Sequence, residues 1–160
     1  MTKIINIEDV MIKHCEINRA LQYNGYPGAE HAKNAEEGLR MIEDALAEGK
    51  PYELLITDME FPVNGVVNSK AGIFVMEELE RKEIQIPIIV CSSVQYDFSE
   101  RKNVIGSVFY NKNRDLNWDF REALAEYKSC TRKNKIRGSF LCYLFREKQY
   151  LKTYRKNLVR

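Results

Sequence analysis

The sequence predicts an α/β protein with a doubly wound, five-stranded parallel sheet, and two observations carry this prediction. Short apolar runs alternate with segments of helical periodicity through the first 128 of the 160 residues. Two of these runs, at residues 52–57 and 86–91, consist mostly of apolar residues. Runs of this kind are typical of strands that helices cover on both faces. Alternation of strand and helix implies right-handed crossovers, so helices are expected on both faces of an open sheet.

The elements are expected in chain order from these patterns. Strands are predicted at residues 3–7, 29–33, 52–57, 86–91 and 107–110. Helices are predicted at residues 10–23, 34–48, 70–82 and 116–127, with a weakly coded one at 96–103. The residues between 61 and 69 are expected to form a polar loop.

The second predicted helix has good signals at both ends. Asn34 can cap the second helix, which ends at Gly49 with Pro51 just beyond. In the first helix, the apolar face is expected to contain Met11, Ile12, Cys15, Ile17 and Leu21.

The charge of the chain is divided unevenly. The net charge is +2, but residues 1–128 carry −7 and residues 129–160 carry +9. This shift predicts a domain at 1–128 and a basic, helical extension at 129–160, in which Leu144, Leu151 and Leu158 recur every seven residues. The extension could pack on the domain or on a second subunit, bind nucleic acid, or bind an anionic membrane surface.

Composition excludes several classes of protein. The longest unbroken apolar stretch is the six residues 140–145, against the roughly 20 that a membrane span needs. The apolar opening meets Glu8 and Asp9 too early for a secretory signal. Four cysteines without a Cys-x-x-Cys pair favour a reduced, cytoplasmic protein over a disulfide framework or a soft-metal site.

Polar side chains follow the predicted strands, at the edge where ligands bind in sheets of this class. They are Glu8 and Asp9 after the first strand, Asp58 after the third, Ser92 after the fourth, and Asn111 and Lys112 after the fifth. Clustered carboxylates repel one another unless they share a cation, and oxygen ligands favour a hard ion such as Mg²⁺.

These residues resemble the receiver domain of two-component response regulators over residues 3–128. Glu8-Asp9 is similar to the acidic pair of that family, and Asp58 resembles its phosphate-accepting aspartate, with Pro62 four positions later. The segment 87–93, which ends in Ser92-Ser93, resembles the fourth-strand segment, and Phe109-Tyr110-Asn111-Lys112 resembles the last one. The resemblance implies the flavodoxin-like receiver fold with strand order 2-1-3-4-5.

The resemblance also implies a role for each residue. Asp58 would accept a phosphoryl group from a histidine kinase or phosphotransfer protein, Lys112 would bind the phosphate, and Ser92 would donate a hydrogen bond to it. Ser92 and Phe109 would form the switch that alters a surface for a downstream protein target. Magnesium would be held by Glu8, Asp9, Asp58 and the backbone carbonyl of Glu60.

On this interpretation the protein is a signalling receiver that catalyses only its own phosphorylation and dephosphorylation. Two other functions stay open. One is a phosphatase of the haloacid-dehalogenase type, although that family places its nucleophile on the first strand, whereas Asp58 follows the third. The other is a receiver-like module that binds partners without being phosphorylated.

Overall fold

The computed structural model describes residues 1–133. The chain divides into two compact units, Met1–Leu124 and Ala125–Arg160. Of the predicted basic extension, only residues 129–133 are described, and they are helical. The leucine stripe at Leu144, Leu151 and Leu158 lies outside the described residues, so the predicted domain division and the role of the extension stay predictions.

The first unit contains the predicted five-stranded parallel sheet, with the order β2-β1-β3-β6-β7. Its strands are β1 (Ile4–Ile7), β2 (Glu30–Ala32), β3 (Leu54–Thr57), β6 (Ile88–Ser92) and β7 (Val104–Phe109). Strands β4 (Phe61–Val63) and β5 (Val66–Asn68) form a separate hairpin. When the five strands of the parallel sheet are numbered in chain order, their order in the sheet is 2-1-3-4-5. The predicted flavodoxin-like receiver fold is therefore confirmed.

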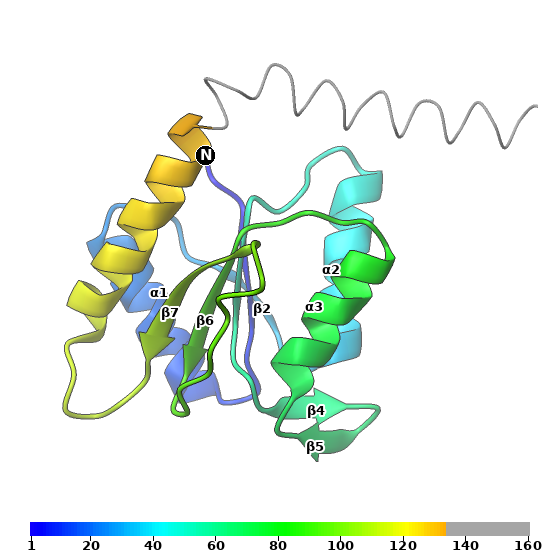
Figure 1. Ribbon diagram of the computed structural model, residues 1–160, viewed down its shortest axis with the longest axis horizontal. Coiled ribbons are helices and arrows are strands. Elements are labelled where there is room, and N and C mark those ends of the chain that lie inside the picture. Colours follow the sequence, from blue (N-terminus) through cyan, green and yellow to red (C-terminus); the bar gives the residue numbers. More distant parts are fainter. Residues whose placement is uncertain (134–160) are drawn as a thin grey trace, which may run out of the picture. The chain divides into compact units, whose positions relative to one another are not determined.

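Helices cover both faces of the sheet, as predicted (Figure 1). Helices α2 (Ala35–Ala47) and α3 (Ala71–Arg81) lie on one face, and α1 (Met11–Tyr23) with residues 116–124 of the following helix lies on the other. Alternate strand residues point to opposite faces. Leu55 therefore joins the core beneath α2 and α3, whereas the equally buried Leu54 and Ile56 point the other way. No helix among residues 1–133 has the length and apolarity to span a membrane.

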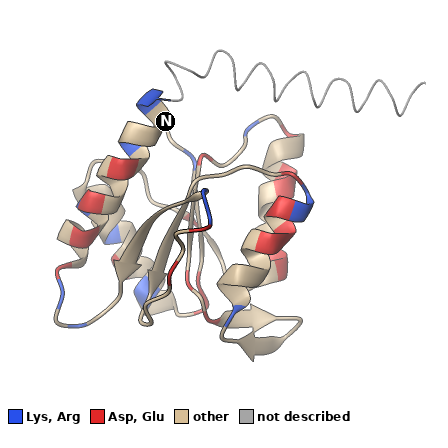
Figure 2. Cartoon of the chain, viewed as in Figure 1, with Lys and Arg blue, Asp and Glu red and all other residues tan. Residues whose placement is uncertain are grey.

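Helix α2 begins where the sequence predicts. The Asn34 side chain accepts a hydrogen bond from the backbone N–H of Glu37 at 2.8 Å, which satisfies one of the free amides of the first turn. Glu37 in turn accepts from the backbone N–H of Lys33 at 2.8 Å. Acidic residues lie along α2 and along α3, as Figure 2 shows.

Helix α1 buries a different face from the one predicted. Its buried residues are Lys13, His14, Ile17, Ala20 and Leu21, while Met11 and Ile12 are 50% and 71% exposed and Cys15 is exposed. Lys13, Ile17 and Leu21 are spaced four residues apart and share one face of a helix. The prediction was wrong at the first turn because the tertiary structure buries two polar side chains in place of two apolar ones.

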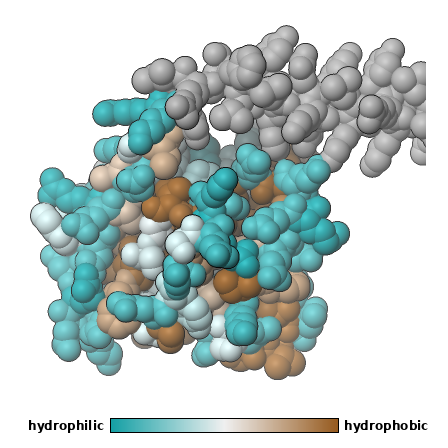
Figure 3. All heavy atoms as spheres, in the orientation of Figure 1, coloured by the Kyte–Doolittle hydropathy of each residue, from teal (hydrophilic) through white to brown (hydrophobic). Residues whose placement is uncertain are grey.

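Residues 61–69 form a hairpin and not the predicted polar loop. Strands β4 (Phe61–Val63) and β5 (Val66–Asn68) pair antiparallel around Asn64-Gly65. Both turn residues have positive φ, at 52° and 78°, the conformation that makes Asn-Gly a preferred two-residue hairpin turn. Phe61 is fully buried, whereas Val66 and Val67 are 70% and 61% exposed. Figure 3 shows an apolar surface over the hairpin.

The weakly coded helix at 96–103 is absent, and β6 is joined to β7 by turns. The Asp97 side chain accepts from the N–H of Ser99 at 2.9 Å, and the N–H of Arg101 donates to the carbonyl of Phe98 at 2.9 Å. Tyr96 and Phe98 pack against the core. Because they alternate with polar residues, their spacing suits an extended segment and not a helix.

Candidate functional site

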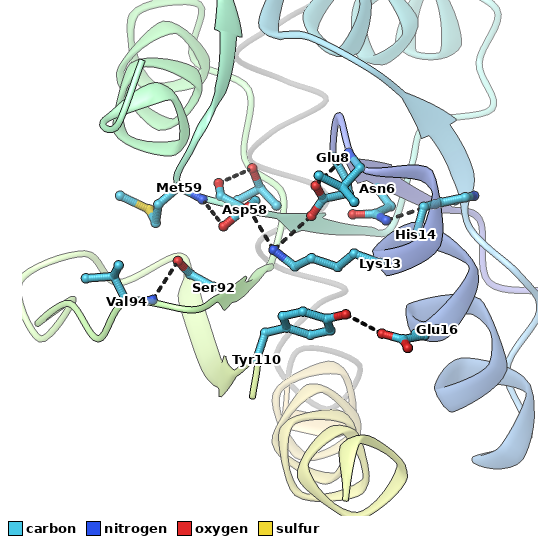
Figure 4. A network of polar contacts seen from close by, with 12 residues as sticks. Asn6, Glu8, Lys13, His14, Glu16, Asp58, Met59, Ser92, Val94 and Tyr110 are labelled. Carbon is cyan, nitrogen blue, oxygen red and sulfur yellow. Dashed lines mark hydrogen bonds and ion pairs between the residues drawn. The ribbon is translucent and has the colours of Figure 1, made fainter. Parts of the chain in front are cut away.

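The carboxyl ends of the strands bring Glu8, Asp58 and Ser92 to one edge of the sheet (Figure 4). Ile7 of β1 and Thr57 of β3 are partners in the parallel register, so Glu8 and Asp58 follow directly on neighbouring strands. Ser92 ends β6, which lies on the other side of β3. The register of the sheet therefore brings these three side chains together, as predicted.

The ammonium of Lys13 lies between the two carboxylates. Its Nζ is 2.8 Å from Oε2 of Glu8 and 2.7 Å from Oδ2 of Asp58. The exposed fractions of the side chains of Lys13, Glu8 and Asp58 are 6%, 0% and 14%. Lys13 comes from the first turn of α1, and Figure 4 shows its side chain extending toward Asp58.

Glu8 is held from several sides. Its Oε1 accepts a hydrogen bond from the N–H of Val10 at 2.9 Å, at the start of α1. Its backbone carbonyl accepts from Nε2 of His31 at 2.6 Å. Oε2 contacts Lys13 as an ion pair, without the angles of a directed hydrogen bond. The carboxylate therefore joins the end of β1 both to the start of α1 and to the ammonium.

Burial and ion pairing shift the pKa values of Glu8 and Lys13. Burial raises the pKa of Glu8 above its usual value, and the nearby Lys13 charge offsets only part of this effect. Burial alone would lower the pKa of Lys13, but the charges of Glu8 and Asp58 outweigh it and raise that pKa. Lys13 is therefore a charged ammonium throughout the neutral range.

Tyr110 covers the Lys13 ammonium from below in Figure 4. The ammonium lies 5.1 Å from the centroid of the Tyr110 ring, within the range of a cation–π contact. The Tyr110 hydroxyl donates to Oε2 of Glu16, which raises the pKa of this tyrosine to about 12. Tyr110 is thus a neutral donor at physiological pH, fixed between β7 and α1.

The backbone around Asp58 is closely packed. Its Oδ1 accepts from the N–H of Met59 at 2.6 Å. Gly72, at the start of α3, donates to the carbonyl of Met59 at 3.2 Å, and a Cβ at Gly72 would lie 2.5 Å from the carbonyl oxygen of Asp58. Only a residue without a side chain permits this approach of α3 to the strand end.

The two predicted switch residues are neighbours in the sheet. Ser92 and Phe109 are register partners on β6 and β7. The Ser92 hydroxyl oxygen accepts a hydrogen bond from the N–H of Val94 at 3.2 Å, and Ser92 is buried. Phe109 is partly exposed.

Three other predicted site residues are exposed. Asp9 follows Glu8, Glu60 lies beyond Asp58, and Lys112 lies in the turn after β7. None of the three forms an ion pair with Glu8, Lys13 or Asp58 within residues 1–133. The cation at Asp58 is thus Lys13, a residue that the sequence analysis did not select.

The arrangement of these carboxylates does not fit a divalent ion while Lys13 stands between them. Mg²⁺ binds oxygen at about 2.0–2.1 Å in a regular octahedron. An ion at that distance from both oxygens would overlap the ammonium, which lies within 2.8 Å of each. The described residues also contain no group of three or more His, Cys, Asp or Glu side chains suited to a metal. Metal binding at this edge would therefore require Lys13 to leave.

The position of Lys13 relative to Ile17 is a signal in the sequence that Lys13 turns inward. Lys13 and His14 precede Ile17 by four and three residues, so a helix that buries Ile17 turns both toward the sheet. His14 stacks on His31 with ring centroids 4.0 Å apart and contacts Asn6 and Asn18 through its two ring nitrogens at 2.9 and 3.1 Å. These buried polar contacts anchor the first turn of α1.

The fold and the charged strand ends define a doubly wound α/β protein with its site at the carboxyl edge of the sheet. Similar solved structures are response-regulator receiver domains, and the fold of this chain is the receiver fold. No protein-family model matches the sequence, and no curated protein does.

Three of the similar structures illustrate the match. The response regulator TrrA from Thermotoga maritima, in complex with Mg²⁺-BeF, has a TM-score of 0.58 and 22% identity over 79% of this chain and 99% of that one. A CheY-like receiver domain from Methanospirillum hungatei has a TM-score of 0.62 and 16% identity over 83% and 98%. The phosphorylated cyanobacterial phytochrome response regulator RcpA has a TM-score of 0.55 and 19% identity over 76% and 88%.

Proposed function

We propose that this protein is a response-regulator receiver that accepts a phosphoryl group on Asp58 and passes the signal on through a protein contact. The observation that carries the proposal is the position of Asp58 directly after β3 of a receiver fold, with its side chain 14% exposed and beside a buried cation. The similar structures include one receiver that is phosphorylated and one bound to Mg²⁺-BeF.

The proposed reaction is a transfer between two side chains. An oxygen of the Asp58 carboxylate attacks phosphorus of a phosphohistidine on a partner kinase or phosphotransfer protein. The P–N bond breaks, the imidazole leaves with its electron pair and takes up a proton, and Asp58 becomes an acyl phosphate. Water later attacks phosphorus, which restores the carboxylate and releases inorganic phosphate. The protein is then an enzyme only toward its own modification.

Charges of the chain itself support this transfer. Attack of a carboxylate on a phosphoryl group brings negative charges together, and a fixed cation nearby lowers that repulsion. Lys13 already contacts Oδ2 of Asp58 at 2.7 Å. We propose that Lys112, exposed on the turn after β7, contacts the phosphoryl group from the solvent side.

The proposed output is a change at β6 and β7. A phosphoryl oxygen on Asp58 would accept a hydrogen bond from the hydroxyl of Ser92, which would leave its contact with Val94. Phe109, its partner in the register, could then occupy the space that Ser92 leaves. The connection from β6 to β7 is built from turns, so we expect the contact surface to involve Tyr96 and Phe98 instead of a helix.

The magnesium site predicted at Glu8, Asp9, Asp58 and the Glu60 carbonyl stays a prediction, and it depends on the displacement of Lys13. We also propose a reduced, cytoplasmic setting, as the cysteine pattern predicts. A downstream protein is the proposed target. Nucleic-acid binding or self-association through the basic extension concerns residues that are mostly outside the described part of the chain.

The test is direct phosphorylation. The wild-type chain is incubated with acetyl phosphate, with and without Mg²⁺, and its intact mass is measured. We expect one phosphoryl group on the wild type and none on Asp58→Asn. Asp44→Asn, which alters an exposed acid on α2, serves as the matched control and should be modified like the wild type. A folded wild-type chain that gains no phosphoryl group under either condition would refute the proposal.

A second function is favoured by one observation. Asp58 already pairs with Lys13 at 2.7 Å, so its carboxylate has a cation partner without phosphate or metal. A receiver-like module that binds partners without being phosphorylated fits this arrangement. Binding of the same partner by wild type and Asp58→Asn with equal affinity, together with no phosphoryl adduct, would select this function over the first.

A further inference from the structure

We propose that Lys13 takes the place of a divalent cation at the acceptor carboxylate, so that the site is permanently occupied by a cation of the chain itself. This inference concerns the site of the proposed function and rests on it only for the role of Asp58 as acceptor. The occupancy of the site by Lys13 rests on the geometry alone.

The position of the ammonium is the first support. It lies 2.8 Å from Oε2 of Glu8 and 2.7 Å from Oδ2 of Asp58, at the point where an ion shared by the two acids would lie. Both contacts are ion pairs, so one positive charge lies within 2.8 Å of each carboxylate. A divalent ion and this ammonium cannot occupy the position together.

The construction around Lys13 is the second support. The residue is 5% exposed, although it belongs to the type that is almost never buried without a partner. Its neighbours on the chain, Met11 and Ile12, are half or more exposed, so the first turn of α1 is oriented to bring the lysine inward. The contact with the two acids therefore follows from the orientation of the helix and not from the flexibility of an exposed lysine side chain.

Tyr110 closes the remaining side of the ammonium. Its ring centroid is 5.1 Å from Nζ, and its hydroxyl is held by Glu16 of the same helix that carries Lys13. The ammonium is therefore contacted by the residues that follow β1 and β3 and by Tyr110 after β7. An ammonium held in this way by its own helix and by the ring loses little further freedom when it pairs with the acids, which favours it over an ion taken from solution.

The consequence is that removal of the Lys13 charge should create a divalent cation site. Lys13→Met keeps a long side chain but leaves the buried Glu8 and the partly buried Asp58 as two adjacent carboxylates that need a cation. We expect this variant to bind one Mg²⁺ at least about tenfold more tightly than the wild type. Mg²⁺ should also raise its thermal unfolding midpoint while leaving that of the wild type unchanged.

The experiment uses the full chain and MgCl₂ alone, with calorimetric titration and thermal unfolding as the two readouts. Lys82→Met removes a surface ion pair with Glu43 and should bind Mg²⁺ no better than the wild type. The double variant Lys13→Met with Glu8→Gln should lose the gained affinity, which would locate the ion at this site.

The outcomes separate this inference from the proposed function. A wild type that binds Mg²⁺ as tightly as Lys13→Met, or a folded Lys13→Met with no gain, overturns the inference even when the wild type is phosphorylated. If Lys13→Met does not fold without metal, refolding on addition of Mg²⁺ supports the inference. If it folds under neither condition, the wild type decides: a rise in its unfolding midpoint with Mg²⁺ overturns the inference, and an unchanged midpoint supports it.

Discussion

The Lys13 ammonium lies 2.7 Å from Oδ2 of Asp58, and neither side chain is more than 14% exposed. This contact joins α1 to the end of β3 across the edge of the sheet where ligands bind in folds of this class. It places a permanent positive charge at the carboxylate that the proposed function requires.

Loss of the Lys13 charge is expected to destabilise the protein strongly when no divalent ion is present. Lys13→Met leaves the buried Glu8 and the partly buried Asp58 without their shared partner, and breaking a buried ion pair such as Glu8–Lys13 costs about 3–5 kcal/mol. Urea unfolding at neutral pH in the presence of a chelator measures the change. Lys82→Met, which breaks a more exposed pair, should cost about 1 kcal/mol or less. Equal costs for the two variants would contradict this account of the site.

Gly72 is expected to tolerate no side chain. In Gly72→Ala the added Cβ would meet the Asp58 carbonyl oxygen at 2.5 Å and the Met59 sulfur at 2.8 Å, so α3 must move away from the strand end. Such overpacking costs about 1–3 kcal/mol, measurable as a lower free energy of unfolding.

Gly28→Ala is the matched control for this substitution. Its Cβ would make only ordinary contacts, at 3.6 Å or more from Asn18. We expect a change within about 1 kcal/mol of the wild type. A Gly72→Ala protein as stable as Gly28→Ala would show that α3 approaches Asp58 less closely than the structure indicates.

His14 is expected to make the protein less stable in mild acid. Burial, and then the charge of the stacked His31, lower the pKa of His14 below 6.5 in the folded state. Asn18 also directs an NH₂ group at Nε2 of His14, which favours a neutral ring. The unfolded chain binds its proton at about pH 6.5. The stability due to neutral His14 is therefore present above pH 6.5 and is lost as the pH falls below that value toward the folded pKa.

An NMR titration of the imidazole signals tests this directly. We expect the His14 midpoint to lie below 6.5 and the free energy of unfolding to decrease between about pH 7 and pH 5. In His14→Gln the part of this decrease that is due to His14 should disappear. A His14 midpoint at or above 6.5 would be inconsistent with the buried stack.

Asn34 is expected to contribute to stability as the cap of α2. Asn34→Ala removes the acceptor for the Glu37 N–H and should lower the free energy of unfolding by about 1 kcal/mol. Lys70, at the same position before α3, makes no side-chain cap, so Lys70→Ala should have little effect. Denaturant unfolding of both variants gives the comparison, and similar losses would rule out a capping role.

Most of the fold could be predicted because its signals are local. The apolar runs that became β3 and β6 and the Asn34 cap of α2 are each contained in a few consecutive residues. The hairpin around Asn64-Gly65 is also encoded locally, but the polar residues around its valines favour a loop prediction. The segment at 96–103 differs from the predicted helix because its aromatic residues alternate as in an extended segment, which short windows do not separate well from a helix.

The site was predictable only in part. Glu8, Asp58 and Ser92 end their strands, so their chain positions alone brought them to one edge once the sheet order was known. The roles predicted for Asp9, Glu60 and Lys112 came from the resemblance, and the structure exposes all three side chains. Charge alone cannot tell which lysine of the chain turns inward, and the spacing of Lys13 from Ile17 indicates it only once α1 is known to bury Ile17.

The sequence by itself determined that a parallel sheet forms, because its apolar runs are buried when helices cover both faces of the sheet. It also determined that acids follow the strands, because these acids come directly after the apolar runs in the chain. Only the tertiary structure decided which cation balances those acids. The choice depends on how α1 rotates against the sheet, and that rotation is set by the packing of Ile17 and Leu21 and by the buried contacts of His14. The resulting geometry brings Lys13 to Asp58 and leaves Lys112 exposed on its turn.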